Sequence, residues 1–137
     1  YDAPLAAFGP GLPAGGITGD LVLVEDSTGN NEGCFTITND SALNGKIALI
    51  DRGNCFFVDK VRNAQAAGAI AVIVVNHLGN FAFSMPAPGG SNTSDITIPS
   101  VMVGLANGNA FKAQLSNTVN ATLAQPTVVA GRGGRFG

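Results

Sequence analysis

Hydrophobic residues along the chain are grouped into short runs, and polar or glycine-rich segments separate these runs. Their length and their β-branched side chains favour strands over helices. In the run at residues 46–51, the expected core residues are Ile47, Leu49 and Ile50. The run at residues 69–75 is apolar throughout, as in a strand covered on both faces. Five strands are predicted in this way, at residues 21–24, 46–51, 69–75, 98–103 and 119–123.

One segment shows helical rather than alternating spacing. Residues 56–67 place Phe57, Val61 and Ala64 on one face, and polar side chains lie away from that face. The segment lies between the second and third predicted strands. Strand, helix and strand in this order form a βαβ unit, so we expect these two strands to be parallel, with a right-handed crossover.

The ends of this helix carry residues with known terminal preferences. Asn54 is expected to cap its N-terminus, and Gly68 is placed to end it in a left-handed conformation. A second, shorter helix is predicted at residues 107–115, with Phe111 and Leu115 on its buried side.

The remaining segments are expected to be loops. The stretch up to Thr18 is rich in Gly, Pro and Ala and has no clear period, and residues 25–33 carry turn-forming side chains. Residues 76–97 make a long connection. Loops of that length inside a compact domain are usually functional or mobile, so this connection is a candidate for ligand contact.

Composition supports one globular domain with a hydrophobic core. Of the 137 residues, 45% are hydrophobic and 12% are charged, and the formal net charge is −2. Such a balance lacks the clustered basic residues that nucleic-acid binding needs. The longest apolar run is much shorter than the roughly 20 residues of a membrane span. We therefore expect neither nucleic acid as a partner nor insertion into a membrane.

The two ends of the chain are typical of a piece of a longer protein. The chain begins at Tyr1 with no Met and no signal peptide, so we expect a mature or excised piece. Residues 126–137 contain arginines among glycines and are interpreted as a flexible linker or tail. The domain is therefore expected to span residues 1–125, with its core at residues 20–124.

Cys34 and Cys55 are the only cysteines, and they suit a disulfide, two free thiols in the core, or half of a metal site. A closed zinc site needs four ligands, whereas His77 is the single histidine, so neither a metal nor another cofactor is expected. Low charge and matches to the N-x-Ser/Thr sequon point to a secreted protein. A secreted location favours the disulfide, which would stabilise the fold by about 3 kcal/mol.

The centre of the chain carries a long and specific motif. Residues 46–71 read KIALIDRGNCFFVDKVRNAQAAGAIA: an apolar strand, Arg-Gly-x-Cys-x-Phe, a Lys three residues on, and a helix that ends in Ala-Gly-Ala. This motif closely resembles the signature of protease-associated domains, and the resemblance extends over about residues 21–123. It implies a mixed α/β fold, with a β-barrel-like or two-sheet core, two short flanking helices and one βαβ unit. It also implies that Cys34 pairs with Cys55.

Protease-associated domains are non-catalytic modules that occur in several kinds of host. Residues 9–13 and 19–24 resemble versions inserted in secreted bacterial metallopeptidases similar to fungalysins. The family also occurs in subtilisin-like proteases, aminopeptidases and plant vacuolar sorting receptors. The resemblance implies a secreted, extracellular accessory domain whose partner is a polypeptide substrate or the host catalytic domain. Two alternatives are a structural module that docks onto its own catalytic domain without binding substrate, and the lumenal cargo-binding domain of a sorting receptor.

Arg52 is the first candidate for a ligand contact. It follows an apolar strand directly, and Gly53 and Cys55 constrain the turn after it. A guanidinium on such a rigid loop offers paired donors to a carboxylate or to peptide carbonyls. In vacuolar sorting receptors, the matching arginine belongs to the ligand-binding loop. The alternative is a structural salt bridge, as most surface arginines form. Its possible partners are Asp26, Asp51 and Asp59.

Aromatic side chains near Arg52 and on the long loop complete the candidate site. Phe56 and Phe57 are expected in the core, although Phe56 also suits a platform for a peptide. Phe81, Phe83 and Met85 form either a contact surface or a plug that folds back over the sheet. The expected peptide-binding residues are Arg52, Gly53, Asn54, Phe56, His77, Phe81, Phe83 and Met85.

His77 follows Asn76 where many relatives carry a second asparagine, and a catalytic role has to be considered. A serine triad needs a nucleophile on a constrained turn and an acid behind the histidine. The chain contains neither Gly-x-Ser-x-Gly nor His-Glu-x-x-His, and Asp40 stands where a P-loop requires its first glycine. We therefore expect no catalytic residue and no enzyme activity, and an enzyme that depends on His77 is the weakest alternative.

Overall fold

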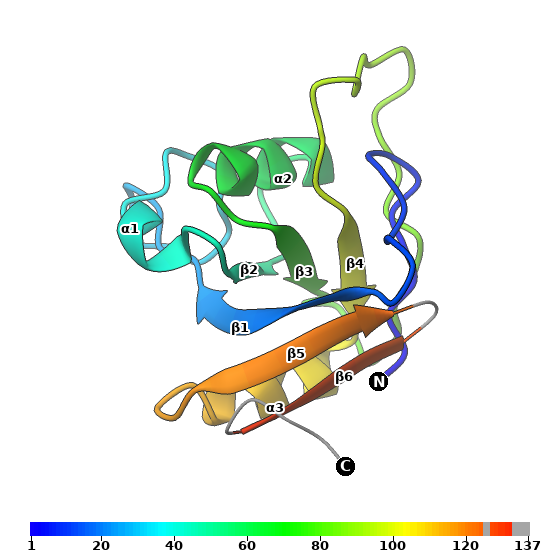
Figure 1. Ribbon diagram of the computed structural model, residues 1–137. Helices are drawn as coiled ribbons and strands as arrows, with labels where there is room; N and C mark the ends of the chain where they lie inside the picture. Colours follow the sequence, from blue (N-terminus) through cyan, green and yellow to red (C-terminus); the bar gives the residue numbers. More distant parts are fainter. Residues whose placement is uncertain (125–126, 133–137) are drawn as a thin grey trace.

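The computed structural model describes residues 1–124 and 127–132, in which helices and strands largely alternate (Figure 1). The helices are α1 (Asp40–Leu43), α2 (Phe57–Ala66) and α3 (Leu105–Ala113). The strands are β1 (Ile17–Leu23), β2 (Ile47–Asp51), β3 (Ala71–Val75), β4 (Ser100–Val103), β5 (Val119–Ala124) and β6 (Thr127–Arg132). They form a six-stranded sheet in the order β4-β3-β2-β1-β5-β6.

Strand β1 joins the parallel and antiparallel parts of this sheet. Residues 21–23 of β1 pair with β2 in parallel, and residues 17–20 pair with β5 in the antiparallel direction. Strands β3 and β4 extend the parallel part, and the β5–β6 hairpin extends the antiparallel part. The mixed α/β class is therefore confirmed, and β1 connects the parallel and antiparallel parts into the six-stranded order.

Two hydrophobic clusters cover the two faces of the parallel part. Along β2, Ala48 and Ile50 pack in the cluster that contains the buried side chains of α2. Ile47 and Leu49 pack in the cluster that contains Phe111 of α3. Every residue of β3 and β4 is buried. Burial on both faces explains why these strands are continuous apolar runs in the sequence.

The predicted βαβ unit is confirmed as β2–α2–β3. Ile47 pairs with Ala71 and Asp51 with Val75 in parallel register. Two further neighbouring pairs, β1 with β2 and β3 with β4, are also parallel. The short helix α1 adds to the two helices that were expected.

The N-terminal end of α2 differs from the prediction, and its C-terminal end agrees with it. Asn54 was expected to be the N-cap, but Phe56 occupies that position in an extended conformation, and Asn54 has a positive φ of 63°. Gly68 ends the helix with a φ of 93°, as predicted. A side chain at residue 68 would also collide with Asn44, whose Oδ1 would lie 2.4 Å from the added Cβ.

The N-terminal segment is more ordered than its irregular composition predicted. Ala3, Ala6 and Phe8 are buried. The segment runs beside β4 (Figure 1), and the N–H of Ala6 donates to the carbonyl of Ser100 (2.9 Å). Because this pairing is local and irregular, the sequence of the segment carries no strand period.

Residues 127–132 also differ from the prediction, which treated residues 126–137 as a linker or tail. They form β6, paired antiparallel to β5. Residue 126 and residues 133–137 lie outside the described residues. Within residues 1–124 and 127–132, no helix is both long and apolar enough to span a membrane.

Candidate functional site

The candidate site lies where β2 and β3 end, at the carboxyl edge of the parallel strands. Arg52 follows β2 and Asn76 follows β3. The N–H of Arg52 donates to the carbonyl of Val75 (2.9 Å), which continues the pairing of the two strands by one step. Arg52 and Asn76 therefore lie side by side, and Nη1 of Arg52 donates to Oδ1 of Asn76 (2.9 Å).

Two aromatic rings support the guanidinium of Arg52. Its central carbon lies 5.8 Å from the ring centre of Phe57 and 5.1 Å from that of Phe83. The two rings contact each other edge to face, with centres 5.9 Å apart. Cation–π attraction at these distances holds the guanidinium in place without neutralising its charge.

The salt bridge considered for Arg52 is not formed, because no carboxylate of residues 1–124 pairs with its guanidinium. The three expected partners are engaged elsewhere: Asp51 with Lys112, Asp59 with Arg62, and Asp26 with N–H and hydroxyl groups of its own turn. Arg52 is therefore a half-buried cation whose hydrogen-bond partner is a neutral amide.

Asn76 is a positioning residue that the sequence analysis did not single out, and it is fully buried. Its Oδ1 accepts from Arg52 and from the N–H of Leu78 (3.1 Å), and its Nδ2 donates to the carbonyl of Phe81 (3.0 Å). One side chain thus fixes both the guanidinium and the start of the long loop. A polar residue directly after an apolar strand was the signal that could have identified it.

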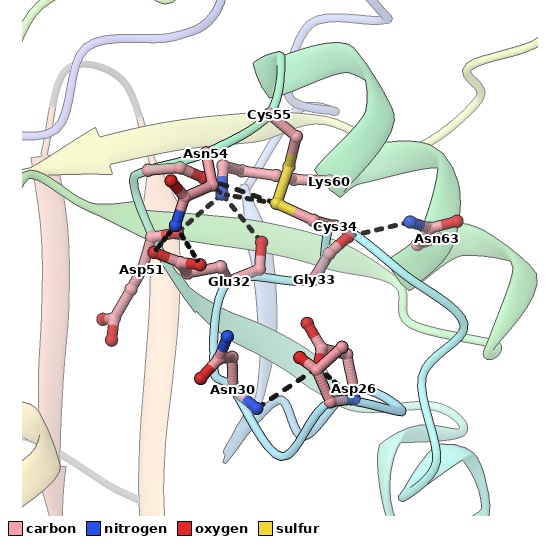
Figure 2. Close-up of a disulfide and its surroundings, with 12 residues drawn as sticks. Asp26, Asn30, Glu32, Gly33, Cys34, Asp51, Asn54, Cys55, Lys60 and Asn63 are labelled. Carbon is pink, nitrogen blue, oxygen red and sulfur yellow. Dashed lines mark hydrogen bonds between the residues drawn. A yellow bond between two sulfur atoms is a disulfide. The ribbon is translucent and has the colours of Figure 1, made fainter.

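The disulfide between Cys34 and Cys55 is formed, as the sequence predicted, with the two Cα atoms 5.7 Å apart (Figure 2). It joins the loop that follows Arg52 to the segment between β1 and α1. The residues after the two cysteines, Phe35 and Phe56, are both exposed. The disulfide therefore anchors two loops that each present an aromatic side chain to solvent.

Lys60 of α2 is fully buried beside this disulfide (Figure 2). Its Nζ lies 3.9 Å from Sγ of Cys34 and donates to the backbone carbonyls of Glu32 (2.7 Å), Asp51 (2.8 Å) and Gly53 (2.8 Å). Burial lowers the pKa of Lys60 to about 8, and the charges of nearby carboxylates oppose part of that shift. The ammonium ties the Arg52 loop to the end of β2 and to the preceding loop.

The turn after Arg52 depends on Gly53 and Asn54. Gly53 has a φ of 137° and Asn54 a φ of 63°, in the region that favours glycine and asparagine. Nδ2 of Asn54 donates to both carboxylate oxygens of Glu32 (2.8 and 3.0 Å). A Cβ on Gly53 would lie 2.6 Å from Oε2 of Glu32. Both residues therefore shape the loop that carries Arg52.

An open pocket of about 440 Å³ lies in front of Arg52. Phe56 stands on its wall and is 62% exposed, so the expectation that Phe56 belongs to the core is wrong. A second open pocket of about 450 Å³ shares Asn54, Cys55 and Phe56 with the first and adds Asp59. The first pocket is lined by Arg52, Gly53, Asn54, Cys55, Phe56, Phe57, His77, Pro86, Ala87 and Pro88.

The long loop separates its three expected contact residues. Met85 is fully buried in the core beside α2, so its assignment to the binding surface is wrong. Phe83 packs partly against the same core and supports Arg52, while Phe81 is 56% exposed. Met85 and Phe83 therefore fold back as the plug, and Phe81 stays exposed to solvent.

His77 is exposed and lines the Arg52 pocket. Among the described residues, no hydrogen bond or ion pair joins it to a carboxylate, so the arrangement of a catalytic triad is not formed there. Leu78, beside it, is 64% exposed and was not singled out from the sequence.

The sequence of this chain is similar to a known domain family and to several known proteins. A protein-family model described as the PA domain matches residues 17–111. Vacuolar-sorting receptor 1 of Pisum sativum is 34% identical over 136 residues, which are 90% of this chain and 21% of the receptor. Probable leucine aminopeptidase 2 of Aspergillus fumigatus is 36% identical over 126 residues, which are 90% of this chain and 23% of that protein. The chain thus spans less than a quarter of either relative.

A solved structure shares the fold over nearly the whole chain. The aminopeptidase from Aneurinibacillus sp. strain AM-1 has a TM-score of 0.65 and 28% sequence identity, covering 96% of this chain and 29% of the aminopeptidase chain. Aminopeptidases and sorting receptors are two of the host types that the sequence resemblance implied.

Proposed function

Because this chain belongs to the protease-associated (PA) domain family, we propose that it is a non-catalytic module that binds an extended polypeptide segment in the pocket beside Arg52. The observation that carries the proposal is the Arg52 guanidinium, which lies on the wall of an open pocket with no carboxylate partner among residues 1–124. The exposed ring of Phe56 and the prolines at residues 86 and 88 give the same pocket an apolar wall. A peptide needs both kinds of contact, polar for its backbone and apolar for its side chains.

The bound polypeptide, in this proposal, is a substrate whose access to a host peptidase the module controls. The likeness to a leucine aminopeptidase and to a solved aminopeptidase supports a peptidase as host. The likeness to a vacuolar-sorting receptor supports cargo binding as a different use of the same pocket. The disulfide suits the oxidising conditions outside the cell or in the lumen of the secretory pathway, where we infer that the protein works.

Docking onto a host catalytic domain is the second candidate function. Leu78 and Phe81 are exposed large apolar side chains on the loop beside the pocket. A neighbouring domain would remove both from water. In that case the loop contacts the host and the pocket takes no separate ligand.

Binding of an unfolded polypeptide distinguishes these candidates. Labelled β-casein is titrated with the 137-residue chain, with Arg52→Met and with Lys46→Met, and fluorescence anisotropy reports binding. Lys46→Met is the matched control, because it also removes one positive charge, but at the end of β2 opposite to Arg52. We expect weak, saturable binding that falls about tenfold or more in Arg52→Met and is unchanged in Lys46→Met. No binding at millimolar concentration contradicts the proposal and favours docking.

A further inference from the structure

We propose, resting on the binding function above, that the pocket selects polypeptide segments with an Asp or Glu side chain, whose carboxylate pairs with Arg52. The acidic side chain occupies the pocket in front of the guanidinium, and the chain continues across Phe56 into the second pocket. The preference is for an internal acidic residue rather than for a free carboxyl terminus.

The pairing of positive charges in the molecule is the first argument. Within residues 1–124, three cations have carboxylate partners: Lys46 with Asp20 (3.8 Å), Arg62 with Asp95 (2.9 Å), and Lys112 with Asp51. The buried ammonium of Lys60 has three carbonyl oxygens. Arg52 has one neutral amide oxygen and two aromatic rings. Among the Lys and Arg side chains of residues 1–124, it alone lies at a pocket without a set of acceptors.

The donor geometry of Arg52 is the second argument. A guanidinium has five N–H donors in a planar fork that matches a carboxylate, and the bond to Asn76 uses one of them. The rings of Phe57 and Phe83 lie 5.8 and 5.1 Å from the guanidinium carbon and accept none of its in-plane hydrogen bonds. A charge-assisted bond in such partly apolar surroundings is stronger than a bond to a peptide carbonyl. The site is thus built for an anion more than for a neutral acceptor.

The arrangement of the two pockets is the third argument, and it favours an internal residue. Both pockets share Asn54, Cys55 and Phe56, so the exposed Phe56 ring stands between two hollows. A chain that ends at Arg52 can fill the second pocket only with the residues before its terminus, whereas a chain with an internal acidic residue also continues past His77 and the prolines that line the first pocket. Asp59 lines the second pocket and disfavours an acidic side chain there, which sets the register of the acidic residue in front of Arg52.

Arrays of immobilised heptapeptides test this preference directly. The peptides are acetylated and attached through their C-termini, with random neutral residues at the flanking positions and Glu, Asp, Gln or Lys at the centre. A further set with Gln at the centre is attached through its N-terminus and ends in a free carboxylate. The labelled 137-residue chain, Arg52→Met and Lys46→Met are applied to each set.

We expect the Glu and Asp sets to retain about tenfold more protein than the Gln set, with the Lys set lowest. Arg52→Met removes the difference between Glu and Gln, and Lys46→Met keeps it. Equal retention by Glu and Gln overturns the acidic preference but leaves polypeptide binding intact. Retention only by peptides with a free carboxylate overturns the assignment to an internal side chain. Retention by no set contradicts both this inference and the proposed function.

Discussion

Lys60 is a buried residue that helps to fix the loop that carries Arg52. Its ammonium bonds three carbonyl oxygens, at residues 32, 51 and 53, which come from two separate segments of the chain. A methionine has nearly the same length but no donor, so Lys60→Met removes the ammonium from all three carbonyls, of which only that of Gly53 keeps another donor, the N–H of Cys55. The residue therefore acts on binding through the position of Arg52 rather than by touching a ligand.

We predict that Lys60→Met lowers the free energy of unfolding by about 3 kcal/mol at pH 7, because each lost hydrogen bond contributes roughly 1 kcal/mol. Urea unfolding measures the change. Arg62→Met is the matched control, since Arg62 pairs with Asp59 and Asp95 at the surface and should change stability by less than about 1 kcal/mol. A Lys60→Met loss no larger than that of the control would contradict a structural role for the ammonium.

The lowered pKa of Lys60 also predicts how stability depends on pH. Burial lowers the pKa of Lys60 from 10.5 to about 8 in the folded protein, whereas the unfolded chain keeps the ordinary value. Between these two values the unfolded chain binds more protons, so the contribution of Lys60 to the free energy of unfolding rises with pH, by up to about 3 kcal/mol. The difference between wild type and Lys60→Met at pH 7 and at pH 10 isolates this contribution. A difference that stays constant would mean that the buried ammonium keeps its ordinary pKa, and a difference that falls would mean that its pKa is raised; either result contradicts the prediction.

At the scale of elements, segments without regular structure are held by anchors to the sheet and to α2. The segment before α1 is tied by the disulfide, and residues 76–97 are tied by the buried Met85. The N–H of Ala7 donates to the carbonyl of Met85 (2.9 Å), so the N-terminal segment anchors that loop in turn. The two loops at the pocket therefore depend on the disulfide and on the burial of Met85 in the core.

Loss of the disulfide is expected to lower the free energy of unfolding by about 3 kcal/mol. Cys34 and Cys55 are 21 residues apart, and in the chain-entropy model a loop of this length restricts the unfolded chain by that amount. Urea unfolding of Cys34→Ala/Cys55→Ala measures the loss, and a reductant should produce a similar loss in the wild type only. If the double variant is as stable as the wild type, the disulfide does not hold the two loops.

The buried N-terminal segment is expected to contribute to stability in spite of its irregular backbone. Phe8 is 4% exposed and packs in the core beside α2, so Phe8→Ala should cost about 3 kcal/mol through the lost burial and the cavity left behind. Phe35→Ala is the matched control, because Phe35 is 55% exposed and should change stability by no more than about 0.5 kcal/mol. Thermal unfolding compares the two variants, and equal effects would rule out an anchoring role for the segment.

Over the whole molecule, the sequence predicts best where local pattern and tertiary burial agree. The unit β2–α2–β3 was predicted because its apolar runs, its helical spacing and Gly68 all coincide with its burial. Strand β6 was missed because the glycines and arginines of residues 126–137 were interpreted as a linker. The N-terminal segment was missed because its order comes from pairing with distant residues. Non-local pairing leaves no period in the segment itself, so no reading of its own residues could have revealed it.

The residues of the candidate site likewise divide into those that the sequence identified and those that it did not. Arg52 and the cysteine pair lie within or near one continuous motif, and the sequence therefore singled them out. Asn76 and the buried Lys60 were not assigned their roles, since each has a partner that is distant in sequence: Arg52 for Asn76 and the carbonyl of Glu32 for Lys60. Met85 was placed on the surface because hydrophobicity alone does not tell which apolar side chains of a loop turn inward.

Polypeptide binding at the Arg52 pocket is the central claim, and mapping of backbone amide shifts by NMR tests it most directly. The isotope-labelled 137-residue chain is titrated with unlabelled β-casein, and Arg52→Met and Lys46→Met are titrated in parallel. We predict saturable shifts at residues 52–57, 77 and 87, which are lost in Arg52→Met and kept in Lys46→Met; residues 86 and 88 are prolines and carry no amide N–H. A spectrum unchanged at millimolar ligand, or shifts confined to another face, would contradict the claim and favour docking onto a host domain.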